Sequence, residues 1–514
     1  MPCRIAQVHL GRAIATATES FATLIFTCLL CTTGSAYAEN SADKGERRDA
    51  RDEVNRDRKN VLVVYVDDLG YGDTGAYGHS IVKTPHIDRL ASEGLRFTQF
   101  YAPSALCSPS RAGLLTGRTP YRTGVESWIP DDAQESLGAN ETTLADLAKQ
   151  RGYRTAVIGK WHLNGGLHMQ EVPQPKDFGF DYQYGLAAWV KNAAVAGSKE
   201  VPRRGPMFPD NMFRNNEAVG PTQKYSAELV SDEAIQWLES SGSDPFFLLL
   251  TYSEVHTPIA SPPEYLDQYQ DYLTAEARDN PSIYYFDWRN RPWRGRGEYY
   301  ANVSFMDAQL GRVIEHLRGK EMLDDTLVIF SSDNGPVTDA ALTPWELGMA
   351  GETGGLRGKK RFLFEGGIRV PGILRLPGRV AAGSVEDQPA TALDVFPTIA
   401  QWLAADVDEG IPIDGDSLWP LIDGKAFERR QAFYWSIPTP DGMEFAVREG
   451  DWKLILDGSG TPHHLFDLAN DWYEVNNLLE SQPVIRDRLL KTFQSRRAAI
   501  ENDPLVRARN ASLH

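Results

Sequence analysis

The residues best suited to chemistry stand directly after four apolar runs of the chain. The four passages read NVLVVYVDD, TAVIGKWHL, DPFFLLLTYSEVH and DTLVIFSSDN, and each changes abruptly from apolar to polar residues. The polar side chains at these points are those of Asp67, Asp68, Lys160, His162, His256, Asp333 and Asn334. Carboxylate and amide oxygens are hard ligands, so Asp67, Asp68, Asp333 and Asn334 together predict a site for Ca²⁺ or Mg²⁺ rather than zinc.

A single cysteine adds to this set. Cys107 precedes Pro109 and Arg111 in the passage ALCSPSRAGLLTGRTP. Proline fits the first turn of a helix, so Cys107 is expected at or just before a helix N-terminus, where unpaired N–H groups favour an anion. Three interpretations stay open at this point: a small buried apolar side chain, a thiolate nucleophile, or the precursor of a modified residue.

The apolar runs predict the fold that would position these residues. Each run is the pattern of a strand buried on both faces, and helical periodicity lies between the runs, for instance at Thr142–Gln150 and Ala301–Arg318. Strands that alternate with helices predict a doubly wound, mostly parallel α/β sheet. Ligands bind at the carboxyl ends of such strands, so residues far apart in the sequence are expected to converge there.

The two ends of the chain differ from this pattern. Residues 1–38 are predicted to be a signal peptide cleaved after Ala38, with lipidation of Cys31 as an alternative, and residues 39–59 a charged flexible lead-in. Residues 60–405 are predicted to be the catalytic domain. Residues 406–514 are predicted to be a smaller α+β subdomain with an antiparallel hairpin around Glu449–Asp451 and a final helix over about Gln482–Glu501.

Charge and cysteine content narrow the class of protein. The net charge of −17 argues against a nucleic-acid partner, and the apolar run of the leader is too short for stable membrane insertion. Without Cys3, Cys28 and Cys31, which lie in the predicted leader, the mature chain cannot form an internal disulfide. Because the chain begins with a predicted signal peptide, we expect an exported protein, periplasmic or secreted.

The motifs resemble those of the formylglycine-dependent type I sulfatases, arylsulfatase-like members of the alkaline phosphatase superfamily. The similar passages occur in the family's order over about Asn60–Pro377: NVLVVYVDDLGYGD, the segment from TPHIDRL to CSPSR, VIGKWHL, VHTP, SSDNG and GGLRGKKRFLFEGGIRVP. The resemblance implies hydrolysis of sulfate monoesters, with Cys107 oxidised to formylglycine (3-oxoalanine) by a formylglycine-generating or anaerobic maturation enzyme. It also implies that Asp67, Asp68, Asp333 and Asn334 bind the cation and that residue 107 touches it.

The same resemblance assigns roles to the basic residues. Arg111 and Lys160 would hold and polarise the formylglycine hydrate, His162 would assist its proton transfers, and His256 and Lys360 would contact the sulfate and the leaving oxygen. Lys359 competes with Lys360 for this role, because the family often has glycine where this chain has Lys359.

The substrate is less clearly indicated than the reaction. Residues 279–300 interleave tyrosine and tryptophan with four arginines, a pattern suited to a sulfated glycan but equally to a packed insertion. Arg203 and Arg204 in Pro202–Asn216, and the pair His463–His464, are weaker candidates for the substrate cleft. The alternative functions are a phosphate or phosphonate ester hydrolase on the same fold, a non-catalytic sulfoglycan-binding protein, and a thiol enzyme.

Overall fold

The computed structural model describes residues 60–187, 208–240, 242, 244–257, 259–275, 278, 295–338 and 349–512, which all belong to the compact unit Val54–His514. The predicted signal peptide and lead-in lie outside the described residues. So do 202–207 and 279–294, and with them Arg203, Arg204 and most of the proposed glycan segment, including both of its tryptophans and three of its four arginines. The fourth, Arg296, begins a helix and forms an ion pair with Glu352 at 3.3 Å.

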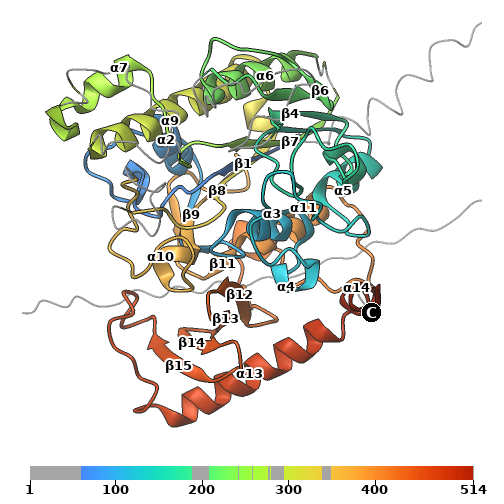
Figure 1. The fold of residues 1–514 in the computed structure, drawn as a ribbon, viewed down its shortest axis with the longest axis vertical. Helices are drawn as coiled ribbons and strands as arrows, with labels where there is room; N and C mark the ends of the chain where they lie inside the picture. The colour runs from blue at the N-terminus through green and yellow to red at the C-terminus, as the bar shows by residue number, and fades with distance from the viewer. Residues whose placement is uncertain are drawn as a thin grey trace, which may run out of the picture. The chain divides into compact units, whose positions relative to one another are not determined.

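A large mixed sheet forms the centre of this unit (Figure 1). Its strands run in the order β10-β2-β9-β8-β1-β7-β3-β4-β5-β6, and β11 pairs with β2. The strands are β1 Asn60–Val66, β2 Leu95–Tyr101, β3 Arg154–Gly159, β4 Tyr182–Leu186, β5 Met212–Arg214, β6 Glu217–Ala218, β7 Phe246–Tyr252, β8 Thr326–Ser332, β9 Arg369–Arg375, β10 Ser384–Glu386 and β11 Ala390–Thr391. The four central strands β8, β1, β7 and β3 are parallel, whereas β9 runs antiparallel to β8. The predicted mostly parallel sheet is confirmed.

Helices cover both faces of this sheet and bury its central strands on both sides. Leu62, Val64 and Val66 pack with the helices α2 (Pro85–Glu93), α6 (Ser226–Ser240) and α9 (Arg296–Gly319). The alternate residues Val61 and Val63 pack with α3 (Cys107–Thr116), α5 (Leu144–Gln150) and α11 (Val395–Trp402). Short helices connect these elements: α4 Pro120–Thr123, α7 Pro263–Leu266, α10 Glu365–Ile368 and α12 Trp419–Ile422. Successive side chains of a strand point to opposite faces of the sheet, so β1 contributes to the hydrophobic core on each side.

The C-terminal part forms a second, antiparallel sheet. Its strands are β12 Phe433–Thr439, β13 Gly442–Glu449, β14 Trp452–Asp457 and β15 Pro462–Asp467. The predicted hairpin is β13–β14, and the predicted final helix is α13 (Pro483–Glu501), which α14 (Pro504–Ser512) follows. One face of this sheet packs on α13, and the other packs on Leu106 and Leu363 of the catalytic segments.

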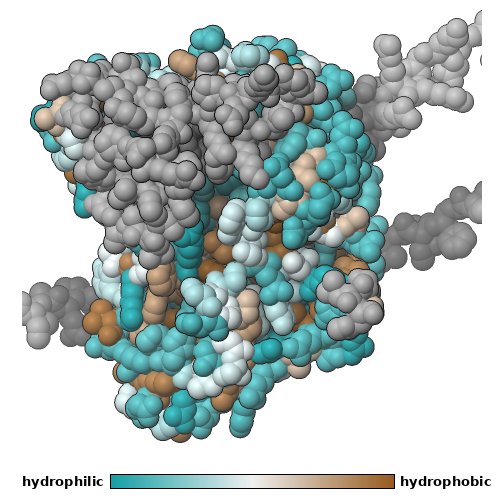
Figure 2. All heavy atoms as spheres, viewed as in Figure 1, coloured by the Kyte–Doolittle hydropathy of each residue, from teal (hydrophilic) through white to brown (hydrophobic). Residues whose placement is uncertain are grey.

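The surface seen in Figure 2 is mainly hydrophilic where it is coloured, and hydrophobic residues appear there in small groups. Among the described residues, none of the helices combines the length and the apolar character that crossing a membrane requires.

Candidate active site

Four adjacent parallel strands bring the predicted residues to one edge of the sheet. Asp67 and Asp68 follow β1, His256 lies in the turn after β7, Lys160 and His162 follow β3, and Asp333 and Asn334 follow β8. Asp68 and His162 have left-handed backbone, with φ values of 62° and 58°. Such conformations cost free energy for residues other than glycine and are typical of functional sites.

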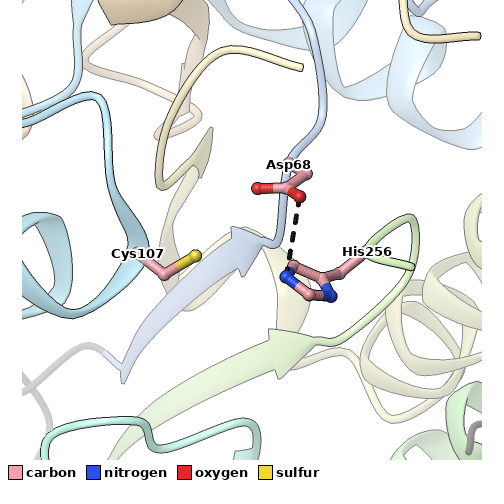
Figure 3. Close-up of side chains that lie close together, drawn as sticks. All are labelled: Asp68, Cys107 and His256. Atoms are coloured by element: carbon pink, nitrogen blue, oxygen red, sulfur yellow. Dashed lines mark ion pairs between the residues drawn. The ribbon is translucent and has the colours of Figure 1, made fainter. Parts of the chain in front are cut away.

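Three carboxylates and the cysteine form the centre of the site. One ligand atom from each of Asp67, Asp68, Asp333 and Cys107 lies within 4.8 Å of the others, and all four residues are buried. Asp68, Cys107 and His256 form a second such group, and Figure 3 shows these three side chains together. The Asp68 backbone N–H donates to Asp333 Oδ1 at 3.1 Å, so the two strand ends also hold each other.

Three basic side chains balance these carboxylates. Lys160 Nζ donates to Asp67 Oδ2, and Lys360 Nζ donates to Asp68 Oδ2 at 2.8 Å. Arg111 donates to Asp333 Oδ2 through Nε at 3.0 Å and through Nη2 at 2.7 Å. Its Nη1 also donates to the Lys160 carbonyl at 2.9 Å, so most of the guanidinium N–H groups are used within the protein.

The burial of so many charges shifts their pKa values. Burial raises the pKa of Asp67, but the positive charges of Lys160, Arg111 and Lys360 outweigh it and hold the pKa well below its ordinary value. Burial and the neighbouring Asp67 charge raise the pKa of Asp333. The pKa of Lys360 is raised because the carboxylate of Asp68 more than offsets its burial. The site therefore contains carboxylates and basic side chains in direct ion pairs, all of them buried.

Cys107 is the first residue of α3, where no side chain caps the helix. Burial is the main cause that raises the pKa of its thiol, ahead of the opposing charges of Lys160 and Lys360. A protonated thiol is a poor nucleophile. Burial therefore disfavours the thiolate that a cysteine nucleophile requires.

The two histidines are held as neutral rings with defined tautomers. His162 Nε2 lies 3.0 Å from the Ile129 carbonyl, which can only accept, so Nδ1 carries no proton. Nδ1 is buried and has no hydrogen-bond partner among the described residues. His256 Nδ1 similarly lies 2.6 Å from the Thr257 carbonyl, and its Nε2 lies 3.8 Å from Asp68 Oδ2. Burial, followed by the charge of Lys360, lowers the pKa of His256 to about 4.

Two buried oxygen atoms among the predicted cation ligands have no hydrogen-bond donor in the described part of the chain. These atoms are Asp67 Oδ1 and Asn334 Oδ1. Asn334 directs its NH₂ group away from this oxygen, to Asp68 Oδ1 at 2.7 Å and to the Gly335 carbonyl. Buried oxygens without donors are costly unless something else binds them. The residues present therefore fit Ca²⁺ or Mg²⁺.

Some supporting residues were not found from the sequence. Ser108 Oγ accepts the Ile129 N–H at 3.0 Å and so links the neighbour of Cys107 to the residue whose carbonyl contacts His162. A buried cluster joins Glu365, Lys453 and Glu474, with Lys453 Nζ 2.9 Å from each carboxylate. No motif signals these contacts, because they depend on how the C-terminal sheet packs. The pair His463–His464, expected on a loop, lies on β15, where His464 packs on Phe364.

Known proteins were compared with the chain. A family model described as Sulfatase matches residues 59–405, and one described as N-sulphoglucosamine sulphohydrolase, C-terminal, matches residues 352–499. Human steryl-sulfatase is 31% identical over 435 residues, which cover 72% of this chain and 70% of the relative. An N-acetylgalactosamine-6-O-sulfatase from Bacteroides thetaiotaomicron is 27% identical over 507 residues, with 86% and 93% covered.

Solved structures share the fold. A crystal structure of Ps i-CgsB in complex with k-i-k-neocarrahexaose has a TM-score of 0.73 at 25% identity and covers 87% of this chain and 94% of that one. The phosphonate monoester hydrolase of Agrobacterium radiobacter has a TM-score of 0.61 at 23% identity, with 86% and 96% covered. The family model alone spans about two thirds of the sequence, in the region that carries the site. The chain therefore belongs to the sulfatase family and is a sulfuric ester hydrolase.

Proposed function

We propose that this enzyme hydrolyses sulfate monoesters of carbohydrates, with the hydrate of a formylglycine derived from Cys107 as nucleophile. The observation that supports this most is the buried grouping of Cys107 with Asp67, Asp68 and Asp333 within 4.8 Å. As formylglycine hydrate, residue 107 supplies one hydroxyl that attacks sulfur and a second whose deprotonation expels sulfate by C–O cleavage and restores the aldehyde.

The residues around position 107 fit this chemistry. The unprotonated Nδ1 of His162 can accept a proton from the hydrate, and Lys160 next to Asp67 can stabilise the oxyanion that results. His256 is the acid that we assign to the leaving alcohol. Burial lowers the pKa of His256, and a bound sulfate monoester would add negative charge nearby and raise that pKa.

Asp67, Asp68, Asp333 and Asn334 would hold a divalent cation, which we propose is Ca²⁺ and which would polarise the sulfate oxygens and neutralise developing charge. The three carboxylates are already matched by Lys160, Lys360 and Arg111. A cation added to this balanced set leaves an excess of positive charge, which favours an anionic substrate. Lys360 is the lysine that we assign to the sulfate, because its Nζ reaches Asp68.

The mass of the tryptic peptide Phe97–Arg111 tests the modification. Protein made in a host with a maturation enzyme should give a peptide lighter by the exchange of the thiol and one hydrogen for an aldehyde oxygen. An intact thiol from that host would refute the proposed nucleophile. Loss of activity on alkylation of Cys107 would instead support the thiol alternative.

A carbohydrate substrate is supported by several of the similar proteins, whose names refer to N-acetylgalactosamine, sulphoglucosamine and neocarrahexaose. Human steryl-sulfatase, at 31% identity, makes a sterol sulfate the alternative. Turnover of sulfated oligosaccharides and of a steroid sulfate, measured side by side, distinguishes the two.

The phosphonate monoester hydrolase among the structural neighbours supports a second candidate reaction. Comparison of kcat/KM for 4-nitrophenyl sulfate and for 4-nitrophenyl phenylphosphonate tests it, and we expect the sulfate to be preferred.

We also propose export after cleavage at Ala38, which N-terminal sequencing of the mature protein tests. A boundary near residue 405 between the catalytic domain and the C-terminal subdomain is supported by the end of the sulfatase match at that residue.

A further inference from the structure

Two large aromatic side chains are exposed on the loop between β15 and α13. Trp472 is 39% exposed and Tyr473 is 44% exposed, and their rings meet edge to face at 5.6 Å. Figure 1 shows this loop rising from the C-terminal sheet beside α10. Neither residue belongs to the catalytic site described above, so their exposure requires its own explanation.

The side chains of this pair are held in place. The Arg369 guanidinium lies 4.6 Å from the centre of the Trp472 ring and 5.2 Å from that of Tyr71. Arg369 is itself buried and donates to the Thr98 carbonyl through Nε at 2.9 Å and Nη2 at 2.6 Å. Trp472 therefore rests on a fixed cation, which restricts its motion without covering its outer face.

The backbone beneath the pair is equally fixed. Glu474, the next residue, is buried and accepts the Glu365 N–H at 2.6 Å, and its carboxylate lies 2.9 Å from Lys453 Nζ. Asp471 accepts the backbone N–H groups of Val475 and Asn476 at 3.1 and 2.7 Å. Rigid aromatic side chains lose little conformational entropy when a ligand binds.

The pair adjoins the segment that carries Lys360. A Cβ atom added to Gly355 would lie 3.3 Å from Tyr473 Cε1, and Gly355 is exposed with a φ of 83°. The absence of a side chain there leaves the edge of the tyrosine ring open. Gly355 and Lys360 are five residues apart, a span of at most about 18 Å. A ligand of a few sugar rings can thus reach from the sulfate position to the pair.

We propose that Trp472 and Tyr473 form a second sugar-binding subsite, which stacks on a ring of the substrate chain beyond the sulfated residue. The assignment rests on the proposed function. Pyranose rings present apolar C–H faces that pack on aromatic rings, and the exposed, preorganised pair offers such a surface next to the catalytic segment. The enzyme then favours oligosaccharides over single sulfated sugars.

The test compares substrates of increasing length. Trp472→Ala/Tyr473→Ala and the ring-retaining Trp472→Phe would be assayed with 4-nitrophenyl sulfate and with disaccharides to hexasaccharides from chondroitin sulfate, heparin and carrageenan. Val484→Ala, at a residue that is 79% exposed on α13, is the surface control. We expect the double alanine variant to raise KM for the hexasaccharide about tenfold, with kinetics on 4-nitrophenyl sulfate unchanged and Trp472→Phe near wild type.

Three outcomes would overturn the subsite. An unchanged KM for the hexasaccharide does so directly. Loss of self-association in the double variant, with unchanged kinetics, would make the pair a contact between protein copies. Turnover of 4-nitrophenyl sulfate but of none of the oligosaccharides by the wild type would refute the subsite and leave the sulfatase reaction intact. Failure on every sulfate ester with formylglycine present would instead refute the proposed function.

Discussion

Replacing Lys453 by methionine tests whether the C-terminal sheet supports the active site. Lys453 is fully buried on β14, and its Nζ lies 2.9 Å from both Glu365 and Glu474. Glu365 begins α10, five residues after Lys360. Methionine keeps most of the side-chain volume and removes only the charge, so two carboxylates lose their shared partner.

The expected loss of stability follows from that burial. Breaking a buried ion pair by removal of one partner costs about 3–5 kcal/mol. Glu365 retains Arg369 at 3.5 Å and the Tyr101 hydroxyl at 2.6 Å, so we expect the lower end, about 3 kcal/mol. Burial and the Glu365 charge already raise the pKa of Glu474, so this carboxyl can protonate and reduce the loss further.

The pH dependence of the loss has a definite sign. Burial raises the pKa of Glu365, but Lys453, Arg369 and Arg448 outweigh it and hold the pKa below the ordinary 4.5. A carboxylate with a lowered pKa stabilises the fold above its ordinary pKa and loses that effect as pH falls. The difference between wild type and Lys453→Met should therefore be largest near pH 7 and shrink below about pH 4.5.

Urea unfolding followed by tryptophan fluorescence at pH 7 and pH 4 measures these differences. Lys425→Met is the control, because Lys425 is 71% exposed and solvent screens its ion pair with Asp423. A loss below about 1 kcal/mol for Lys453→Met at pH 7, equal to that of the control, would refute the claim that this cluster supports the fold.

Three further predictions address the site and the core. Lys360→Ala should lower kcat/KM for 4-nitrophenyl sulfate about 10²–10³-fold, and Lys359→Ala much less; the reverse order would assign the sulfate contact to Lys359. Removal of divalent cations with EGTA should abolish activity, and added Ca²⁺ should restore it, whereas full activity in the chelator would exclude the proposed cation. Burial raises the pKa of Asp307 to about 7 from 3.8, so the contribution of this carboxyl to wild-type stability should fall by up to roughly 4 kcal/mol between about pH 4 and pH 7. Asp307→Asn should remove much of that fall in urea unfolding, and a variant that retained it would contradict the assignment.

The central strands could be predicted because they are buried on both faces. A strand such as Asn60–Val66 reads as a continuous apolar run, and its position fixes where Asp67 and Asp68 begin. The edge strands were not predicted individually. β6 and β11 have two residues each, and so short a segment carries no period that distinguishes a strand from a loop.

One basic residue of the site could be placed from the strand pattern, and another could not. Lys160 follows a buried strand and was placed from the pattern alone. Lys360 lies on an irregular segment, and its contact with Asp68 depends on backbone bonds such as that of its own N–H to the Pro336 carbonyl at 2.9 Å. Neither periodicity nor spacing predicts such a contact.

The sequence by itself determined the strand ends, the position of Cys107 at the start of a helix, and an oxygen-rich donor set, because local patterns of apolar and polar residues encode them. The tertiary structure alone decided that Arg111 binds Asp333 and that Asn334 Oδ1 accepts no hydrogen bond from the residues that the structure describes. It also decided that the C-terminal sheet contacts the segment after Lys360 through the ion pair of Lys453 with Glu365. These contacts join residues that are far apart in the chain. Their geometry is set by the packing of whole elements, which no local pattern encodes.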